Sequence, residues 1–292
     1  MKRHFYFLLL LPLVFAACNI INPKEATPTY LHVDPFSYSN PDSNITGSSS
    51  HDIPSAWIYV NDQPVGTFDL PCTVPVIMSK NSKVLIVPAV TNQGLKSYVF
   101  QYPFYQSDTC TLLYNPGKIQ SYSPKTRYYT DLTATAFRMK NNFEEGLLFK
   151  NLSGDTTMVL EKDPSKVFEG SACGAIYLKA PQTSVECIAQ NYFQVDNINN
   201  KCYLEIDYKA SIPFQIGIQG ESATTGNVYG EYLAGFYPKA TWSKLYIELS
   251  TFILNNQSYN KYYLKFRSSF SDFEGQYSDG YVLIDNIKVI SR

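Results

Sequence analysis

Histidine is nearly absent from this sequence. Of 292 residues only three are histidine, His4, His32 and His51, and they lie in the first 51 positions. A Ser-His-Asp or Cys-His mechanism needs a histidine beside its nucleophile, and histidine is a frequent zinc ligand. The sequence also has no Gly-x-Ser-x-Gly motif and no Cys-x-x-Cys pair. These absences argue against such hydrolases and against a zinc site.

Clusters of Lys and Arg are lacking as well, and the formal net charge is −1. Binding to phosphate backbones requires such clusters, so we expect no nucleic-acid partner. The one long apolar run, from Phe5 to Phe15, is too short to span a bilayer. We therefore expect no membrane-spanning helix.

The first 18 residues have the pattern of a secretion signal that ends on a cysteine. Lys2 and Arg3 precede the apolar run, and Ala16-Ala17-Cys18 follows it. This pattern resembles a bacterial lipoprotein signal, with residues 1–17 as the signal peptide. The resemblance implies a lipid on Cys18 and an outer-membrane lipoprotein, on the periplasmic face or at the cell surface. The alternative is an ordinary signal peptide followed by an unrelated cysteine.

Pro, Asn, Ser and Thr are frequent in residues 18–52, which include Pro23, Pro28, Pro35 and Pro41. Such a composition is typical of extended linkers. We predict that residues 18–52 form the lipidated Cys18 and a flexible tether that holds the folded part away from the membrane.

Aromatic residues are abundant, with 24 Tyr and 18 Phe against 4 Met. This enrichment favours strands, and we predict an all-β protein. In residues 53–135, strand-like runs flank the polar turn Asn61-Asp62-Gln63-Pro64. The stretch from Ile58 to Thr67 resembles the opening of PEGA-type surface domains. The resemblance implies a small N-terminal β-sandwich over residues 53–135, without catalytic residues.

Residues 136–292 contain many short strand-like runs without helical periodicity. In the run Cys202 to Lys209, Leu204 and Ile206 alternate with Glu205 and Asp207. Strands of this number and spacing predict a C-terminal jelly-roll β-sandwich.

Two motifs bracket this second segment, Asn142-Phe143-Glu144 near its start and Leu283-Ile284-Asp285-Asn286 near its end. Together they resemble the galactose-binding-like jelly roll of carbohydrate-binding modules. In that class the two motifs lie side by side, which implies that Glu144 and Asp285 are ligands of a structural calcium ion. The alternative is a solvated glutamate and a turn-forming aspartate.

Four aromatic residues are candidates for carbohydrate binding: Tyr229, Tyr232, Phe236 and Tyr237. They lie in a segment between Gly220 and Lys239 that we expect to be a long loop, and such loops often carry binding sites. A hydrophobic cap is the alternative for the same residues.

Glu205 and Asp207 resemble the paired carboxylates of some jelly-roll glycoside hydrolases. The longer acidic signature of those enzymes is absent, and Lys209 follows as an ion partner. We predict that the pair lies on a solvated strand face, and that the protein is not an enzyme.

Cysteine gives an odd count once Cys18 is set aside: Cys72, Cys110, Cys173, Cys187 and Cys202. Disulfides persist outside the cytoplasm, and the pairs Cys72 with Cys110 and Cys187 with Cys202 are conceivable. Buried free thiols are the alternative, and the sequence leaves both open.

Taken together, the patterns resemble an envelope lipoprotein of the Bacteroidota type. We expect a non-catalytic, lipid-anchored protein whose jelly roll binds carbohydrate or another surface polymer. A structural or assembly lipoprotein that contacts other envelope proteins is the alternative, and a glycoside hydrolase is a distant third.

Overall fold

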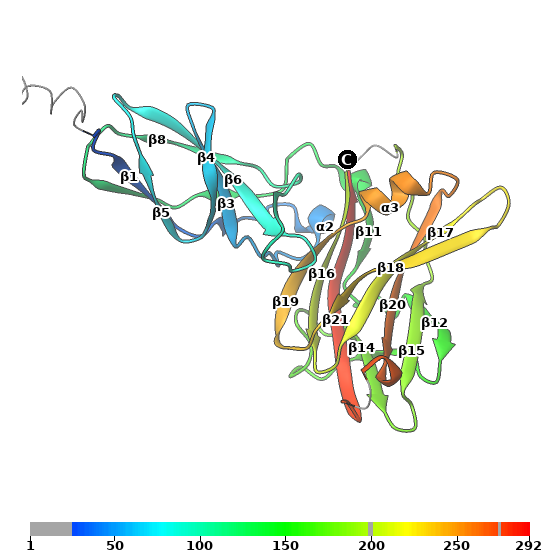
Figure 1. Cartoon of the computed structure of the whole chain (residues 1–292). Helices are drawn as coiled ribbons and strands as arrows, with labels where there is room; N and C mark the ends of the chain where they lie inside the picture. Colours follow the sequence, from blue (N-terminus) through cyan, green and yellow to red (C-terminus); the bar gives the residue numbers. More distant parts are fainter. Residues whose placement is uncertain (1–24, 198–200, 274–275) are drawn as a thin grey trace, which may run out of the picture.

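The computed structural model describes residues 25–197, 201–273 and 276–292. Strands make up 53% of it and helices 6%. Figure 1 shows a smaller N-terminal unit beside a larger C-terminal sandwich. The prediction of an all-β chain that ends in a jelly-roll sandwich is confirmed. No helix of the described residues is long and apolar enough to cross a bilayer.

The N-terminal unit contains three sheets around one hydrophobic core. The largest has the order β4-β3-β6-β7, with β8 paired to the other half of β6. The others have the orders β5-β1-β9 and β10-β2. The elements are β1 Thr29–Val33, β2 Ser37–Tyr38, α2 Ser43–Thr46, β3 Ser55–Val60, β4 Gln63–Asp69, β5 Cys72–Val76, β6 Ser82–Thr91, β7 Val99–Gln101, β8 Asp108–Leu112, β9 Ile119–Tyr122, β10 Lys125–Thr126 and the 3-10 turn η1 Ala134–Ala136.

The hairpin of β3 and β4 has the strand-turn-strand form that the sequence predicts. Asn61 and Asp62 connect the strands and have φ angles of 49° and 63°. Two central residues with positive φ make the type I′ turn, whose twist matches that of paired strands, and Asn and Asp tolerate this conformation better than most residues. The resemblance to PEGA-type domains stays a prediction.

The predicted flexible tether is wrong for residues 25–52. Strand β1 is the central strand of its sheet, and Leu31 and Val33 are fully buried in the core. Ser50 Oγ donates a hydrogen bond to Asp207 Oδ1 of the C-terminal sandwich. The Pro-rich composition favoured a linker, but the same stretch contains a short alternation of apolar residues that a partner sheet buries. The rest of the predicted tether, residues 18–24, lies outside the described residues.

The C-terminal sandwich consists of two sheets. The proximal sheet, which contacts the N-terminal unit, has the order β13-β14-β21-β16-β19, with β11 also paired to β21. The distal sheet has the order β12-β15-β20-β17-β18. The elements are β11 Phe137–Asn141, β12 Phe149–Gly154, β13 Met158–Glu161, β14 Cys173–Lys179, β15 Ser184–Ala189, β16 Cys202–Ala210, β17 Phe214–Glu221, β18 Val228–Phe236, β19 Lys239–Glu248, α3 Ser250–Asn255, β20 Lys261–Ser269, the 3-10 turn η2 Phe270–Phe273 and β21 Asp279–Ser291. Both sheets contribute to one core, for example through Ile206 and Phe266.

The two units share a buried junction. Tyr203 of β16, Tyr246 of β19 and Ile290 of β21 belong to the hydrophobic cluster of the N-terminal unit. Gln93 N donates to Tyr246 O at 2.8 Å across this junction. The outer face of the proximal sheet is therefore partly covered, whereas the distal sheet lies on the side away from the N-terminal unit (Figure 1).

Candidate functional site

The outer face of the distal sheet carries a group of polar and tyrosine side chains. On β15, β17 and β20 every second residue enters the core, as Cys187, Ile216 and Phe266 do. The alternating residues must then point outward. We give the name distal face to eight of these outward residues: Glu186, Gln215, Glu221, Tyr232, Lys261, Tyr263, Lys265 and Arg267.

Tyr232 lies across this face because its neighbour has no side chain. Gly217 of β17 sits between Tyr232 on β18 and Lys265 on β20 in the strand register. A Cβ at Gly217 would lie 2.9 Å from Tyr232 Cδ1 and 2.5 Å from the Glu231 carbonyl oxygen. Because Gly217 has no Cβ, the centroid of the Tyr232 ring lies 4.7 Å from Lys265 Nζ.

Glu186 is the centre of a hydrogen-bond cluster on the distal face. Its carboxylate accepts hydrogen bonds from the Tyr232 hydroxyl, from Lys265 Nζ at 3.0 Å and from Ser153 Oγ at 2.8 Å. Burial tends to raise the pKa of Glu186, but these three donors outweigh it and lower the pKa. Burial, and then the bond to Glu186, raise the pKa of Tyr232. The tyrosine therefore stays a donor and the glutamate stays ionised.

Two further groups extend the distal face along the sheet. Arg267 donates to Gln215 at 2.8 Å and pairs with Asp272 at 3.1 Å. Nearer the other end, Glu221 accepts from Lys261 at 3.0 Å and from the Tyr263 hydroxyl at 2.9 Å. Tyr192, 46% exposed, packs edge-on against Tyr263. The face thus combines partly exposed tyrosines with donors and acceptors held in fixed positions.

Of the four aromatic residues predicted to bind ligand, the structure places only Tyr232 on the distal face. Phe236 is 6% exposed and belongs to the core. Tyr229 stacks on Phe252, and Tyr237 is 81% exposed beyond the end of β18. The expected long loop is mostly the edge strand β18, so alternate side chains leave on opposite sides. The alternation with apolar residues along the chain could have identified four residues that the sequence prediction missed: Lys261, Tyr263, Lys265 and Arg267.

The prediction of a solvated face for Glu205 and Asp207 is wrong. Their side chains are 0% and 1% exposed, because the N-terminal unit covers them. The Tyr102 and Tyr128 hydroxyls donate to Glu205 Oε1 at 2.6 Å and 2.7 Å. The alternation of acidic and apolar residues on β16 did reveal two faces, but it contained no sign that another part of the chain covers the acidic one.

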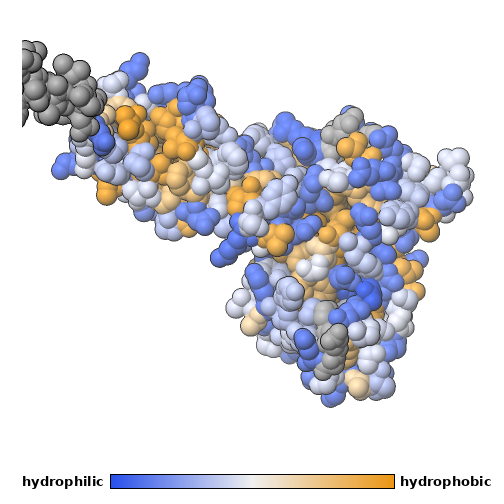
Figure 2. Space-filling view, in the orientation of Figure 1, coloured by the Kyte–Doolittle hydropathy of each residue, from blue (hydrophilic) through white to orange (hydrophobic). Residues whose placement is uncertain are grey.

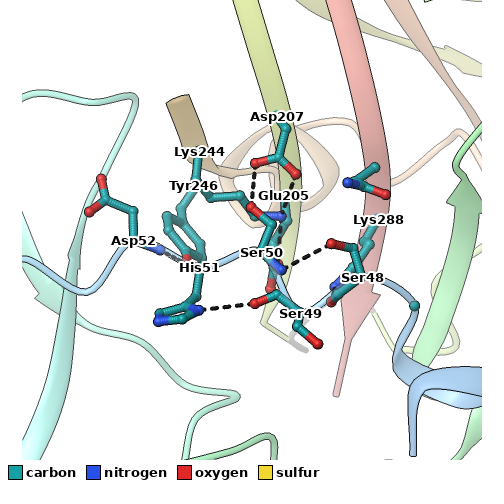
Figure 3. A network of polar contacts seen from close by, with 12 residues as sticks. Ser48, Ser49, Ser50, His51, Asp52, Glu205, Asp207, Lys244, Tyr246 and Lys288 are labelled. Carbon is teal, nitrogen blue, oxygen red and sulfur yellow. Dashed lines mark hydrogen bonds and ion pairs between the residues drawn. The ribbon is translucent and has the colours of Figure 1, made fainter. Parts of the chain in front are cut away.

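The ion partner of this pair is Lys244 and not Lys209. Lys244 Nζ lies 3.5 Å from Glu205 Oε2 and 3.6 Å from Asp207 Oδ2. Figure 3 shows residues 48–52 passing beside this cluster, and Lys288 Nζ donates to Ser48 O at 2.6 Å. The carboxylates face protein groups on all these sides, so they serve the junction and are not open to a substrate.

Glu144 and Asp285 both accept hydrogen bonds from the last residues of the loop that precedes β14. Glu144 accepts hydrogen bonds from Ser171 N at 2.8 Å and Ala172 N at 3.1 Å, whereas Asp285 accepts one from Glu169 N at 3.3 Å. Glu144 lines a polar cavity of about 640 Å³, and Asp285 does not. No group of three or more acidic, His or Cys side chains suited to a metal occurs in the parts of the chain described. Both carboxylates accept hydrogen bonds from backbone N–H groups, and a calcium ion held by Glu144 and Asp285 stays a prediction of the resemblance.

Because the Asp285 carboxyl is buried, we expect the free energy of unfolding to depend on pH. Burial raises the pKa of Asp285 to about 7, with smaller effects of Asp207 and Glu169 in the same direction. Between about pH 4 and pH 7 the folded chain then keeps a proton that the unfolded chain releases, so stability falls as the pH rises. We expect urea unfolding to show this loss, at most about 4 kcal/mol, and Asp285→Asn to reduce it. An equal pH dependence in the variant would contradict this assignment.

The five cysteines of the described residues, Cys72, Cys110, Cys173, Cys187 and Cys202, are all free. Burial raises the pKa of the Cys187 thiol to about 12. Of the two alternatives that the sequence left open, the structure has the free thiols.

Comparisons with known proteins found solved structures only. No protein-family description matches the chain, and no curated protein matches its sequence. One similar structure is TmCBM61 in complex with β-1,4-galactotriose, at 14% identity over 53% of this chain and 99% of that chain, with a TM-score of 0.36. Another is the C-terminal family 22 carbohydrate-binding module of Clostridium thermocellum Xyn10B, at 11% identity over 55% and 96%, with a TM-score of 0.36.

A third is the enzymatically active domain of bacteriophage CBA120 tailspike protein 4. It is 10% identical over 60% of this chain but only 26% of that chain, with a TM-score of 0.41. Carbohydrate-binding-module jelly rolls are thus among the structural neighbours.

Proposed function

We propose that this chain is a non-catalytic, lipid-anchored envelope protein that binds a carbohydrate polymer through its distal face. The observation that carries the proposal is the group of partly exposed tyrosines beside hydrogen-bonded polar groups on the outer face of the distal sheet, on the side away from the N-terminal unit (Figure 1). Sugar rings present apolar C–H faces and equatorial hydroxyls. Tyrosine rings suit the former, and carboxylate, amide and guanidinium groups suit the latter.

A neutral polymer fits this face better than a charged one. Lys265 pairs with Glu186, Lys261 pairs with Glu221, and Arg267 pairs with Asp272. Because these cations already have partners, an anionic polymer would have to break ion pairs in order to bind. Binding to a neutral glycan should therefore depend little on salt.

The anchor and the absence of catalysis complete the proposal. Lipid on Cys18 would hold the chain to the outer membrane, on the periplasmic face or at the cell surface. The acidic pair that most resembles a glycosidase site, Glu205 and Asp207, is buried at the junction and paired with Lys244. This burial supports binding without hydrolysis.

The test is a glycan array followed by affinity electrophoresis of the protein in gels that contain neutral or acidic polysaccharides. We expect retention by at least one neutral polysaccharide, unchanged between low and high salt, and no release of reducing ends. Retention by no glycan, combined with a stable envelope protein in a pull-down, would contradict the proposal and favour the assembly alternative.

A further inference from the structure

Four large apolar side chains are exposed at one end of the N-terminal unit. Ile77 is 73% exposed, Ile119 66%, Leu113 55% and Tyr114 48%. Most side chains of this size are buried in folded proteins, and a group of exposed ones marks a contact surface. We call this end of the unit the tip and define it by these four residues.

Backbone contacts place the tip around the point where the chain enters β1. Gly117 N donates to Pro28 O at 2.8 Å, and Tyr30 N donates to Lys118 O at 2.9 Å. Val76, which precedes Ile77, is the register partner of Thr29. Figure 2 shows hydrophobic residues on the surface of the N-terminal unit.

Lysines lie beside the apolar residues of the tip. Three exposed lysines lie close to them: Lys118 precedes Ile119, Lys83 pairs with Thr111 near Leu113, and Lys80 precedes Asn81, which accepts a hydrogen bond from Tyr114 N. The exposed acidic residues nearby in the chain are Asp62 and Glu25. Branched aliphatic side chains, a tyrosine and lysines together suit the interface of a bilayer. There the apolar groups enter the headgroup region, the tyrosine stays at its level and lysines approach lipid phosphates.

The length of the preceding chain keeps the tip near a membrane. Six residues, Asn19 to Lys24, separate Cys18 from Glu25. Even fully extended they reach only about 20–25 Å. We propose that the tip rests on the lipid bilayer to which Cys18 is anchored. This inference depends on the lipid on Cys18, which belongs to the proposed function.

The contact would give the N-terminal unit the role that the sequence assigned to a tether. The distal sheet lies at the opposite end of the molecule from the tip (Figure 1). With the tip on the bilayer, the shared junction core holds the sandwich away from the membrane. The distal face then points toward polymer outside the lipid surface.

The test uses the full chain purified from producing cells and reconstituted into vesicles of phosphatidylethanolamine and phosphatidylglycerol. Ile119→Trp places a fluorophore at the tip, and Tyr237→Trp places one at an exposed position of the sandwich as control. Both positions are exposed, so both variants should fold, which circular dichroism would check. The fluorescence of each introduced tryptophan is the difference between the variant and the unsubstituted chain. In vesicles with brominated lipid we expect this difference for Ile119→Trp to shift to the blue and to be mostly quenched. For Tyr237→Trp we expect it to be unchanged.

Flotation of the vesicles separates failure of the anchor from failure of the tip contact. A chain that floats without quenching at Ile119→Trp would overturn the tip contact and leave the anchor intact. A chain that does not float would overturn both the lipid anchor and the contact that depends on it. Neither outcome bears on glycan binding by the distal face.

Discussion

Replacing Lys244 with alanine is expected to lower the free energy of unfolding by about 3–5 kcal/mol, because it removes one partner of a buried ion cluster. The Lys244 side chain is 2% exposed between Glu205 and Asp207, which are no more exposed. Without it, two carboxylates face the junction with Lys288 as their remaining nearby cation. The measurement is urea unfolding followed by circular dichroism.

The matched control is Lys239→Ala, an exposed lysine on the same strand. We expect it to change the free energy of unfolding by less than about 0.5 kcal/mol. Combining Lys244→Met with Glu205→Gln and Asp207→Asn should recover much of the loss, since all three charges are then removed together. Equal effects of Lys244→Ala and Lys239→Ala would show that the cluster does not stabilise the junction.

Replacing Tyr232 with alanine is expected to weaken glycan binding by about tenfold or more, which corresponds to about 1.4 kcal/mol. The substitution removes the ring that lies across Gly217 and the hydroxyl that orients Glu186. Tyr232→Phe keeps the ring and should lose less. Isothermal titration calorimetry, with the polysaccharide that retains the protein in the gels, measures these differences in affinity.

Tyr237→Ala is the control for this second prediction. Tyr237 is 81% exposed and follows β18, but it lies outside the distal face. Its loss should leave the affinity unchanged. If Tyr237→Ala weakened binding and Tyr232→Ala did not, the site would lie at the end of β18, as the sequence first suggested for that segment.

Local patterns in the sequence predict the strands well. Alternation such as that of Leu204 and Ile206 with Glu205 and Asp207 identifies a strand with two different faces, and the structure has β16 there. The Asn61-Asp62 turn similarly predicts the hairpin of β3 and β4. Each of these features depends only on residues that are close together in the chain, so it can be predicted from a single sequence.

Contacts between distant segments account for what the sequence did not reveal. Whether Glu205 meets solvent depends on Tyr102 and Tyr128, which lie more than 70 positions away. Likewise, Tyr232 finds its place through Gly217 and Glu186 on two other strands. The candidate site could not be assembled without the strand order, because its members come from β15, β17, β18 and β20.

The most direct test of the central claim, glycan binding on the distal face, is hydroxyl-radical footprinting of the protein with and without the polysaccharide that retains it. The account predicts that the polysaccharide protects Tyr192, Tyr232 and Tyr263 from oxidation, while Tyr237 in the same sample reacts as before. Protection of Tyr237 or Tyr229 with unchanged labelling of Tyr232 and Tyr263 would contradict it.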